Sequence, residues 1–436
     1  MGHGSASTGA TRSVRAAVAG LGAALLLLAG CTSPTGETTG SEVLESRSPR
    51  AAVAVTDVPA AAATVVAATS GLGARLLNAD PDQNLVVSPI SVMVAFAMLR
   101  EGAATTTAAE LDRALGFPAE YRGEAMNALL GQLQLHEGDP GEVTVGQVPP
   151  EPVLHVADQL FVQEGFEVQQ PFLDALATHY GADVLRVDFA ARGPASGRAV
   201  VDDWVAEHTG GEVDEAPMPF DRTTRLALLN AVRLAAAWQE PFSDATALGQ
   251  FHRPDGTTTT AAFLEDTREL AYLTTQNGTA AVRIPYTAAF AMDVVLPAPG
   301  LRWDPAGWPE AAAGLDAAAP VSVELTLPTW SHTSSLDLSP SLREAGLTET
   351  LGAAPDLSGI APGLWISAAA HQATITVDAA GTVAGAVTGI AATESAEVVE
   401  GAPVFRADRP FAYRIVHLPT GLPVFMGQVV DPADAP

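Results

Sequence analysis

Residues 224–242 read TRLALLNAVRLAAAWQEPF, and the architecture expected for the chain follows from this stretch. The apolar run from Leu226 to Trp238 carries one amide and one cation among aliphatic and small side chains. A long run of this kind suits a central strand of a sheet rather than an edge strand or a surface helix.

Other strand and helix patterns surround this run. Strand-like segments lie near residues 84–87, 153–163, 184–189, 281–286, 291–297, 321–327, 373–378, 412–417 and 423–430. Helical patterns lie at 60–78, 88–100, 107–115, 171–180, 199–209 and 340–345. We expect Ser88 to cap the helix beginning at Pro89, and Thr107 with Glu110 to form a capping box. Helices early and strands later predict an α+β fold, and no Gly/Ser-rich linker divides residues 59–436, which predicts one domain.

Composition excludes some partners. The chain has 436 residues, is 47% hydrophobic and carries a formal net charge of −28 with only 22 basic residues, all of them arginine. Nucleic acid and heparin-type polysaccharides are therefore not expected as partners, because both require a basic stripe. Frequent Ala, Gly, Pro and Arg without Lys indicates a GC-rich bacterial genome.

The N-terminus has the pattern of an export signal. Arg12 and Arg15 precede an apolar stretch at 16–29 that is too short to span a bilayer as an ordinary helix. Residues 1–30 resemble a lipoprotein signal peptide, with the sole cysteine, Cys31, as the lipidated residue; an ordinary secretory signal with an incidental cysteine is the alternative. Residues 31–58 predict a flexible tether. The expected location is the cell surface, anchored through the lipid alone, or the extracellular space after shedding.

No catalytic or metal motif is visible. The sequence lacks Gly-x-Ser-x-Gly, His-Glu-x-x-His, a phosphate-binding Gly-rich loop and Cys-x-x-Cys. The nine histidines are scattered, without a pair at helical spacing. We therefore expect no metal, no cofactor and no enzymatic activity, which favours a binding or inhibitory role.

One segment near the C-terminus is unusual in so acidic a chain. Residues 379–393 read AAGTVAGAVTGIAAT and contain no charge. If this segment became a strand, one face would carry only small or apolar side chains: Thr382, Ala384, Ala386, Thr388, Ile390 and Ala392. Such a face can be buried at low cost; a plain flexible loop is the alternative.

Ordered motifs over about 350 residues resemble the serpin family of serine protease inhibitors. They include Asn84, Ser88-Pro89, Ser91, Gly102-Ala103, Leu160-Phe161-Val162-Gln163, Thr224-Arg225-Leu226, Asn230-Ala231, Trp238, Pro241-Phe242, Leu357-Ser358-Gly359-Ile360, His371, Gly381-Thr382, Asp408-Arg409-Pro410-Phe411 and Phe425-Met426-Gly427. The resemblance implies three β-sheets, about nine helices and an exposed C-terminal reactive loop at about 379–404. It also implies suicide inhibition: a protease cleaves the loop, and the loop inserts into the central sheet with the acyl-enzyme trapped.

The resemblance assigns roles to individual residues. The hinge comprises Gly381, Thr382, Val383, Ala384, Gly385, Ala386, Val387 and Thr388. The cluster that controls sheet opening comprises Ser88, Ser91, Asn230, His371 and Trp238. The scissile bond is placed at Ser395-Ala396, with cleavage at Glu394 as the alternative. No Arg or Lys lies between residues 379 and 404, so an elastase-like or subtilisin-like target is expected, or a glutamate-specific one if cleavage follows Glu394.

Some positions depart from the family pattern. Ala379-Ala380 replaces the usual acidic pair before the hinge, and Gly385 and Gly389 interrupt it. Glycine weakens a strand through backbone entropy, which would slow insertion. A non-inhibitory surface lipoprotein that binds a ligand is therefore the second hypothesis, and a surface hydrolase is the third. In each case we expect a monomer.

Overall fold

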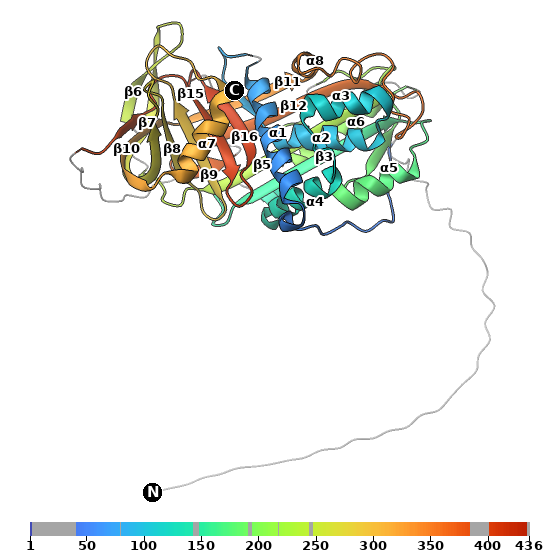
Figure 1. Ribbon diagram of the computed structural model, residues 1–436, viewed down its shortest axis with the longest axis horizontal. Helices are drawn as coiled ribbons and strands as arrows, with labels where there is room; N and C mark the ends of the chain where they lie inside the picture. Colours follow the sequence, from blue (N-terminus) through green and yellow to red (C-terminus); the bar gives the residue numbers. More distant parts are fainter. Residues whose placement is uncertain are drawn as a thin grey trace, which may run out of the picture. The chain divides into compact units, whose positions relative to one another are not determined.

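The computed structural model describes residues 1, 41–78, 80–142, 148–190, 194–216, 218–243, 247–383 and 401–433 (Figure 1). These residues form eight α-helices and two hydrogen-bonded sheets. The fold is α+β, as predicted, with one α-helix fewer in the described residues than the expected nine or so.

The first sheet has seven strands, with the predicted central strand in its middle. In spatial order these are β1 (Ser41–Leu44), β4 (Val184–Val187), β3 (Val153–Gln163), β5 (Leu226–Ala237), β13 (Gly381–Val383), β12 (Ile366–Val377) and β11 (Trp330–Asp337). All residues of β5 except the last are buried. The long apolar run therefore occupies the position that its pattern predicts.

The second sheet has nine strands and lies at the other end of the molecule (Figure 1). Its path is β14 (Val404–Arg406), β10 (Pro320–Pro328), β7 (Thr258–Thr274), β8 (Ala280–Pro285), β9 (Phe290–Leu296), β15 (Phe411–His417), β16 (Leu422–Val429) and β2 (Leu85–Val87), with β6 (Ala247–His252) also beside β7. Three sheets were expected, but the described residues form two, because two of the expected sheets are joined into this nine-stranded sheet. The reason is β7: residues 263–271 pair with β10, and residues 271–274 continue the same strand into pairing with β8.

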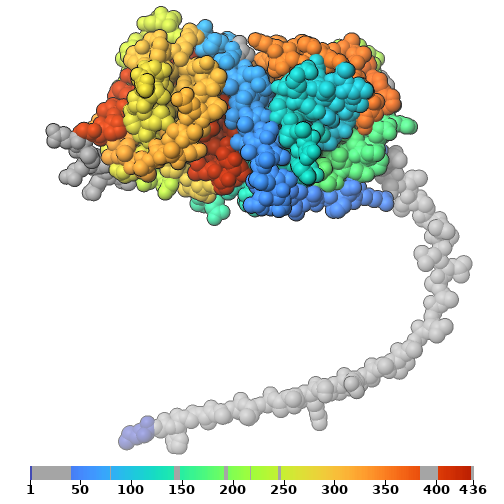
Figure 2. All heavy atoms as spheres, viewed as in Figure 1, coloured from blue at the N-terminus to red at the C-terminus, as the bar shows by residue number. Residues whose placement is uncertain are grey.

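The helices are α1 (Pro59–Leu77), α2 (Pro89–Gly102), α3 (Thr105–Leu115), α4 (Arg122–Leu133), α5 (Gln170–Ala175), α6 (Pro194–His208), α7 (Trp308–Ala317) and α8 (Ser339–Glu344). Figure 2 shows α1 crossing the middle of one face, between the C-terminal strands on one side and α2 to α4 on the other. Residues 89–99 of α2 are all buried, so this helix lies inside the core rather than on it. Among the described residues one helix, α1, is long and apolar enough to cross a membrane by composition, but half of that window is buried inside the domain.

The predictions for both helix caps are wrong, because neither Ser88 nor Thr107 makes the predicted capping hydrogen bond. Ser88 stands at the N-cap of α2, but its hydroxyl bonds to the hydroxyl of Ser91 at 3.0 Å instead of capping the backbone. Thr107 lies inside α3, and Glu110 accepts hydrogen bonds from the distant backbone N–H groups of Glu349 (3.0 Å) and Thr350 (2.7 Å). Tertiary partners have displaced the local bonds that the spacing predicted.

The tether prediction for residues 31–58 is wrong for the part that the structure describes. Strand β1 pairs antiparallel with β4 along its whole length, and the N–H of Val53 donates to Asn127 Oδ1 at 3.0 Å. Folded chain is thus present from Ser41, earlier than the expected boundary at residue 59. The sequence pattern gave no sign of this strand, because it is short and at the edge of the sheet. Its backbone hydrogen bonds, rather than a run of apolar side chains, keep it in place. Cys31 and the signal segment lie outside the described residues.

Candidate functional site

The start of the expected hinge is a strand already seated between β5 and β12. In β13, Gly381 and Thr382 lie opposite Ala237 and Ala236 of β5, antiparallel. On the other side Thr382 lies opposite Val377 of β12. The first hinge residues are therefore inserted into one end of the seven-stranded sheet.

A tight turn returns the chain from β12 into this position. The carboxylate of Asp378 accepts hydrogen bonds from the backbone N–H groups of Ala380 (2.8 Å) and Gly381 (3.1 Å), which is typical of an Asx turn. A Cβ on Gly381 would lie 2.2 Å from the carbonyl oxygen of Ala236. Only glycine fits this close approach of two backbones.

Two stacked aromatic side chains, Trp238 and Tyr286, contact the inserted hinge. The ring of Trp238 stacks on Tyr286 with centroids 4.3 Å apart, and its Nε1 donates to the carbonyl of Asp378 at 2.9 Å. The hydroxyl of Tyr286 bonds to that of Thr382, whose side chain is 2% exposed. Burial raises the pKa of Tyr286, so the phenol stays neutral. Sequence reasoning missed Tyr286, because nothing local marks a residue that reaches the hinge from the other sheet.

Below the hinge, β5 and β12 pair directly only over a short distance in the described chain. Their parallel register joins residues 226–228 to residues 366–369. Farther along, His371 of β12 reaches Asn230 of β5 with a hydrogen bond of 2.6 Å between Nδ1 and Oδ1. The middle of this strand pair is bridged by side chains in place of a backbone ladder.

The structure brings Ser88, Ser91, Asn230 and His371 into one buried cluster, with none more than 8% exposed. The backbone N–H of Ser88 donates to Nε2 of His371 at 2.9 Å, so Nδ1 carries the proton and donates to Asn230. Burial lowers the pKa of His371 to about 4, and the ring is neutral at neutral pH. A neutral imidazole that donates once and accepts once therefore connects α2 to both strands.

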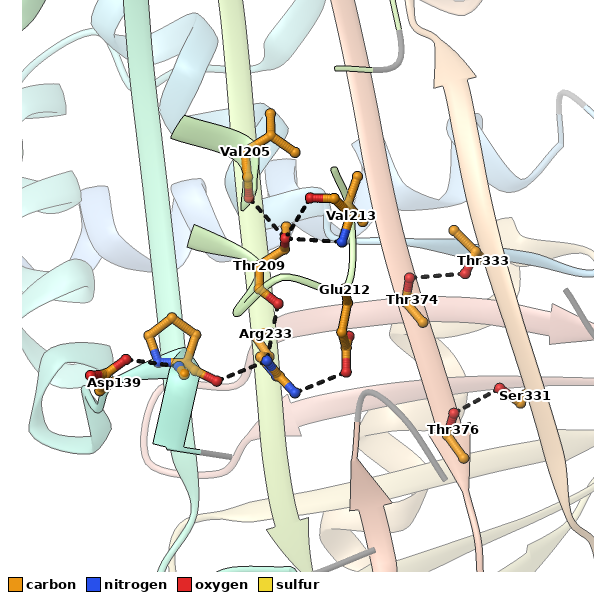
Figure 3. Close-up of polar contacts among 12 residues, drawn as sticks. Asp139, Val205, Thr209, Glu212, Val213, Arg233, Ser331, Thr333, Thr374 and Thr376 are labelled. Atoms are coloured by element: carbon orange, nitrogen blue, oxygen red, sulfur yellow. Dashed lines mark hydrogen bonds and ion pairs between the residues drawn. The ribbon is translucent and has the colours of Figure 1, made fainter. Parts of the chain in front are cut away.

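The loop after α6 is fastened across the front of β5, as Figure 3 shows. The guanidinium of Arg233 donates to the carbonyls of Pro140 (2.8 Å) and Thr209 (3.0 Å) and to Glu212 (2.8 Å). Burial raises the pKa of Glu212, and the charge of Arg233 opposes that shift. No sequence motif marked this contact. This loop lies against the place where a strand would enter between β5 and β12, because Thr209 and Val213 line one small cavity together with Asn230 of β5 and Ala370 of β12.

Other predicted residues lie outside the described chain. These are hinge residues Ala384 to Thr388, the bond residues Ser395 and Ala396 with the alternative Glu394, and Cys31. Where residues are described, no group of three His, Cys, Asp or Glu side chains is arranged to hold a metal ion.

Comparisons with known proteins agree with this geometry. The family model "Serpin (serine protease inhibitor)" matches residues 67–432. An uncharacterized serpin-like protein of Thermococcus kodakarensis is 30% identical over 82% of both chains. The leukocyte elastase inhibitor of Bos taurus is 28% identical over 82% of this chain and 95% of its own.

Solved structures show the same fold. The thermophilic serpin tengpin in its native state has a TM-score of 0.74 at 22% identity, covering 89% of this chain and 97% of tengpin. A thyroxine-binding globulin complex with thyroxine has a TM-score of 0.73 at 23% identity, covering 86% and 99% of the two chains. Serpins are protease inhibitors and not enzymes. By its fold, its motifs and the family match, this chain belongs to the serpin family.

Proposed function

We propose that this serpin is a suicide-substrate inhibitor of serine proteases. A protease would cleave the reactive loop and form an acyl-enzyme, and the loop would then enter the seven-stranded sheet before the ester is hydrolysed. Strand addition of this kind is how serpins are known to work. In this mechanism the protease performs the cleavage, and the serpin acts only as its substrate and trap.

The observation that carries the proposal is the arrangement of β5, β13 and β12. The hinge enters one end of the sheet as β13, and the opposite end of β5 pairs directly with β12. A full-length inserted strand would replace the side-chain bridge of Asn230 and His371 with two backbone ladders. The gain in backbone hydrogen bonds would therefore provide a driving force for insertion of the loop.

The target class follows from the loop sequence. Cleavage at Ser395-Ala396 suits an elastase-like or subtilisin-like enzyme, and cleavage after Glu394 suits a glutamate-specific one. The likeness to a leukocyte elastase inhibitor supports the first choice. We also propose that Cys31 is lipidated and anchors a monomer at the cell surface, because the sole cysteine follows Leu28-Ala29-Gly30.

The test is to incubate the protein with elastase, subtilisin and a glutamate-specific protease. We expect a covalent complex that survives boiling in detergent, together with a released C-terminal peptide that begins at Ala396. Loop cleavage without a complex for every protease would overturn inhibition. In that case the glycines at 385 and 389 would be the physical reason, because glycine weakens a strand and slows its insertion, and a non-inhibitory binding lipoprotein would be the better assignment.

A further inference from the structure

A cavity of about 240 Å³ opens along residues 154–159 of β3. Its apolar walls come from α2 and α4 through Val94, Met98, Leu130 and Leu133. This volume suits a small organic molecule and exceeds what one or two waters fill. The inhibition mechanism proposed above makes no use of it.

The carboxylate of Asp158 lines this cavity, and one of its oxygens has no hydrogen-bond partner in the described chain. The Oδ1 atom of Asp158 is buried, and no hydrogen-bond donor in the described part of the chain reaches it. Burial raises the pKa of Asp158 well above its usual value. Asp158 lies opposite Asn230 in the β3–β5 register, and the Asn230 Oδ1 atom is engaged by His371. A buried polar group without a partner is rare in a folded protein and calls for a ligand that supplies one.

We propose that this cavity binds a small primary alkylammonium ion, with the carboxylate of Asp158 as its counterion. An ammonium head offers three N–H donors and a positive charge, and its alkyl tail fits the walls from α2 and α4. Asp183 and Glu137 also line the cavity, which adds negative potential around its polar part. The net charge of −28 raises the local concentration of cations further.

A metal ion fits this cavity less well than an amine. Among the described residues no three His, Cys, Asp or Glu side chains converge as metal ligands. The carboxylate of Glu137 is already engaged by His155, and His155 in turn bonds His208 of α6. Among the carboxylates that line the cavity, Asp158 therefore offers a buried oxygen without a hydrogen-bond partner in the described chain, which suits one ammonium group.

The experiment titrates the purified full-length protein with n-hexylammonium at pH 8 by calorimetry, without any protease. The matched probe is n-hexanol, which has the same chain and no charge. We expect saturable one-site binding of the ammonium, and binding at least about tenfold weaker for the alcohol. Asp158→Asn keeps the shape of the side chain and should weaken the ammonium to the level of the alcohol. Glu137→Gln should leave most of the affinity, because that carboxylate is already bonded to His155.

Equal affinity for hexylammonium and hexanol would overturn the proposal, as would undiminished ammonium binding by Asp158→Asn. The comparison of the two probes on the unaltered protein needs no variant, so it decides the matter even if a substitution impairs folding. Neither result depends on whether the protein inhibits a protease.

Discussion

The nine-stranded and seven-stranded sheets complete their bonding in different ways. In the nine-stranded sheet, β15 pairs with β16 along its whole length and with β9 over six of its residues. In the seven-stranded sheet, β5 and β12 pair directly only at residues 226–228 and 366–369 of the described chain, and β13 separates them at the other end.

The side chains that bridge neighbouring strands also differ between the two sheets. Asp293 in β9 is fully buried and accepts hydrogen bonds from Arg283 and Arg414 at 2.6 to 3.0 Å. Strands β5 and β12 of the seven-stranded sheet are bridged instead by the neutral pair His371 and Asn230. Strand β15 of the nine-stranded sheet is therefore paired with neighbours on both sides, while the seven-stranded sheet keeps a place for one more strand between β5 and β12. Four predictions test this contrast.

The largest effect is expected from Thr382→Arg at the hinge. A guanidinium in place of a side chain that is 2% exposed would have to be buried without a counter-charge. We expect the covalent protease complex to disappear while loop cleavage continues. Gel analysis with elastase or subtilisin measures this. Thr258→Arg at the exposed start of β7 in the other sheet is the control and should leave complex formation unchanged. A normal yield of complex from Thr382→Arg would contradict hinge insertion.

Asp293→Ala should destabilise the protein by about 3–5 kcal/mol, because it removes the buried carboxylate that pairs with Arg414 and with the mostly buried Arg283. Urea denaturation measures the loss. Asp316→Ala is the matched control: it also pairs with Arg283, at 2.6 Å, but its side chain is 66% exposed. A loss below about 1 kcal/mol is expected there. Similar losses for both variants would show that burial of Asp293 is unimportant.

Acid should weaken the fold through its buried histidines. Burial lowers the pKa of His371 and of His417 to about 4 from an ordinary value of 6.5. The unfolded chain therefore binds more protons than the folded one between these values, and stability falls as the pH drops from about 6.5 to about 4. Urea denaturation across this range should show a shallower slope for His371→Gln. The same test on His417→Gln compares the nine-stranded sheet. Unchanged slopes in both variants would exclude these histidines as the cause.

The smallest effect is a gain in stability from Asp158→Asn. Burial raises the pKa of Asp158 in the folded protein, so folding favours the protonated side chain. Ionisation of this side chain costs the fold nothing below the unfolded pKa of 3.8. As the pH rises through the folded pKa, the buried carboxylate lowers the stability of the protein. Removing this ionisation should stabilise the protein at pH 8 by about 1–3 kcal/mol in the absence of amines. The gain should vanish near pH 4. A destabilised variant at pH 8 would show that Asp158 has a partner that compensates its burial.

Much of the seven-stranded sheet was predictable from local pattern. The observed β5 ends one residue before the predicted run from Leu226 to Trp238, and β3 has the predicted bounds of 153–163. Long apolar runs of this kind have few alternatives to burial inside a sheet. In contrast, β1 lies in a polar segment, and the continuity of two sheets through β7 depends on strand partners remote in sequence.

The candidate site divides in the same way. The family resemblance alone singled out Ser88, Ser91, Asn230 and His371. Their hydrogen bonds, the contact of Tyr286 with Thr382, and the uncompensated burial of Asp158 are contacts between segments far apart in the chain. The sequence by itself determined the fold family, the central strand and the uncharged segment that begins with the hinge, because each is a local pattern of side chains. Only the tertiary structure decided that the first hinge residues, Gly381 to Val383, are seated between β5 and β12 and that Asp158 has a buried oxygen without a partner in the described chain, because both depend on distances between distant segments.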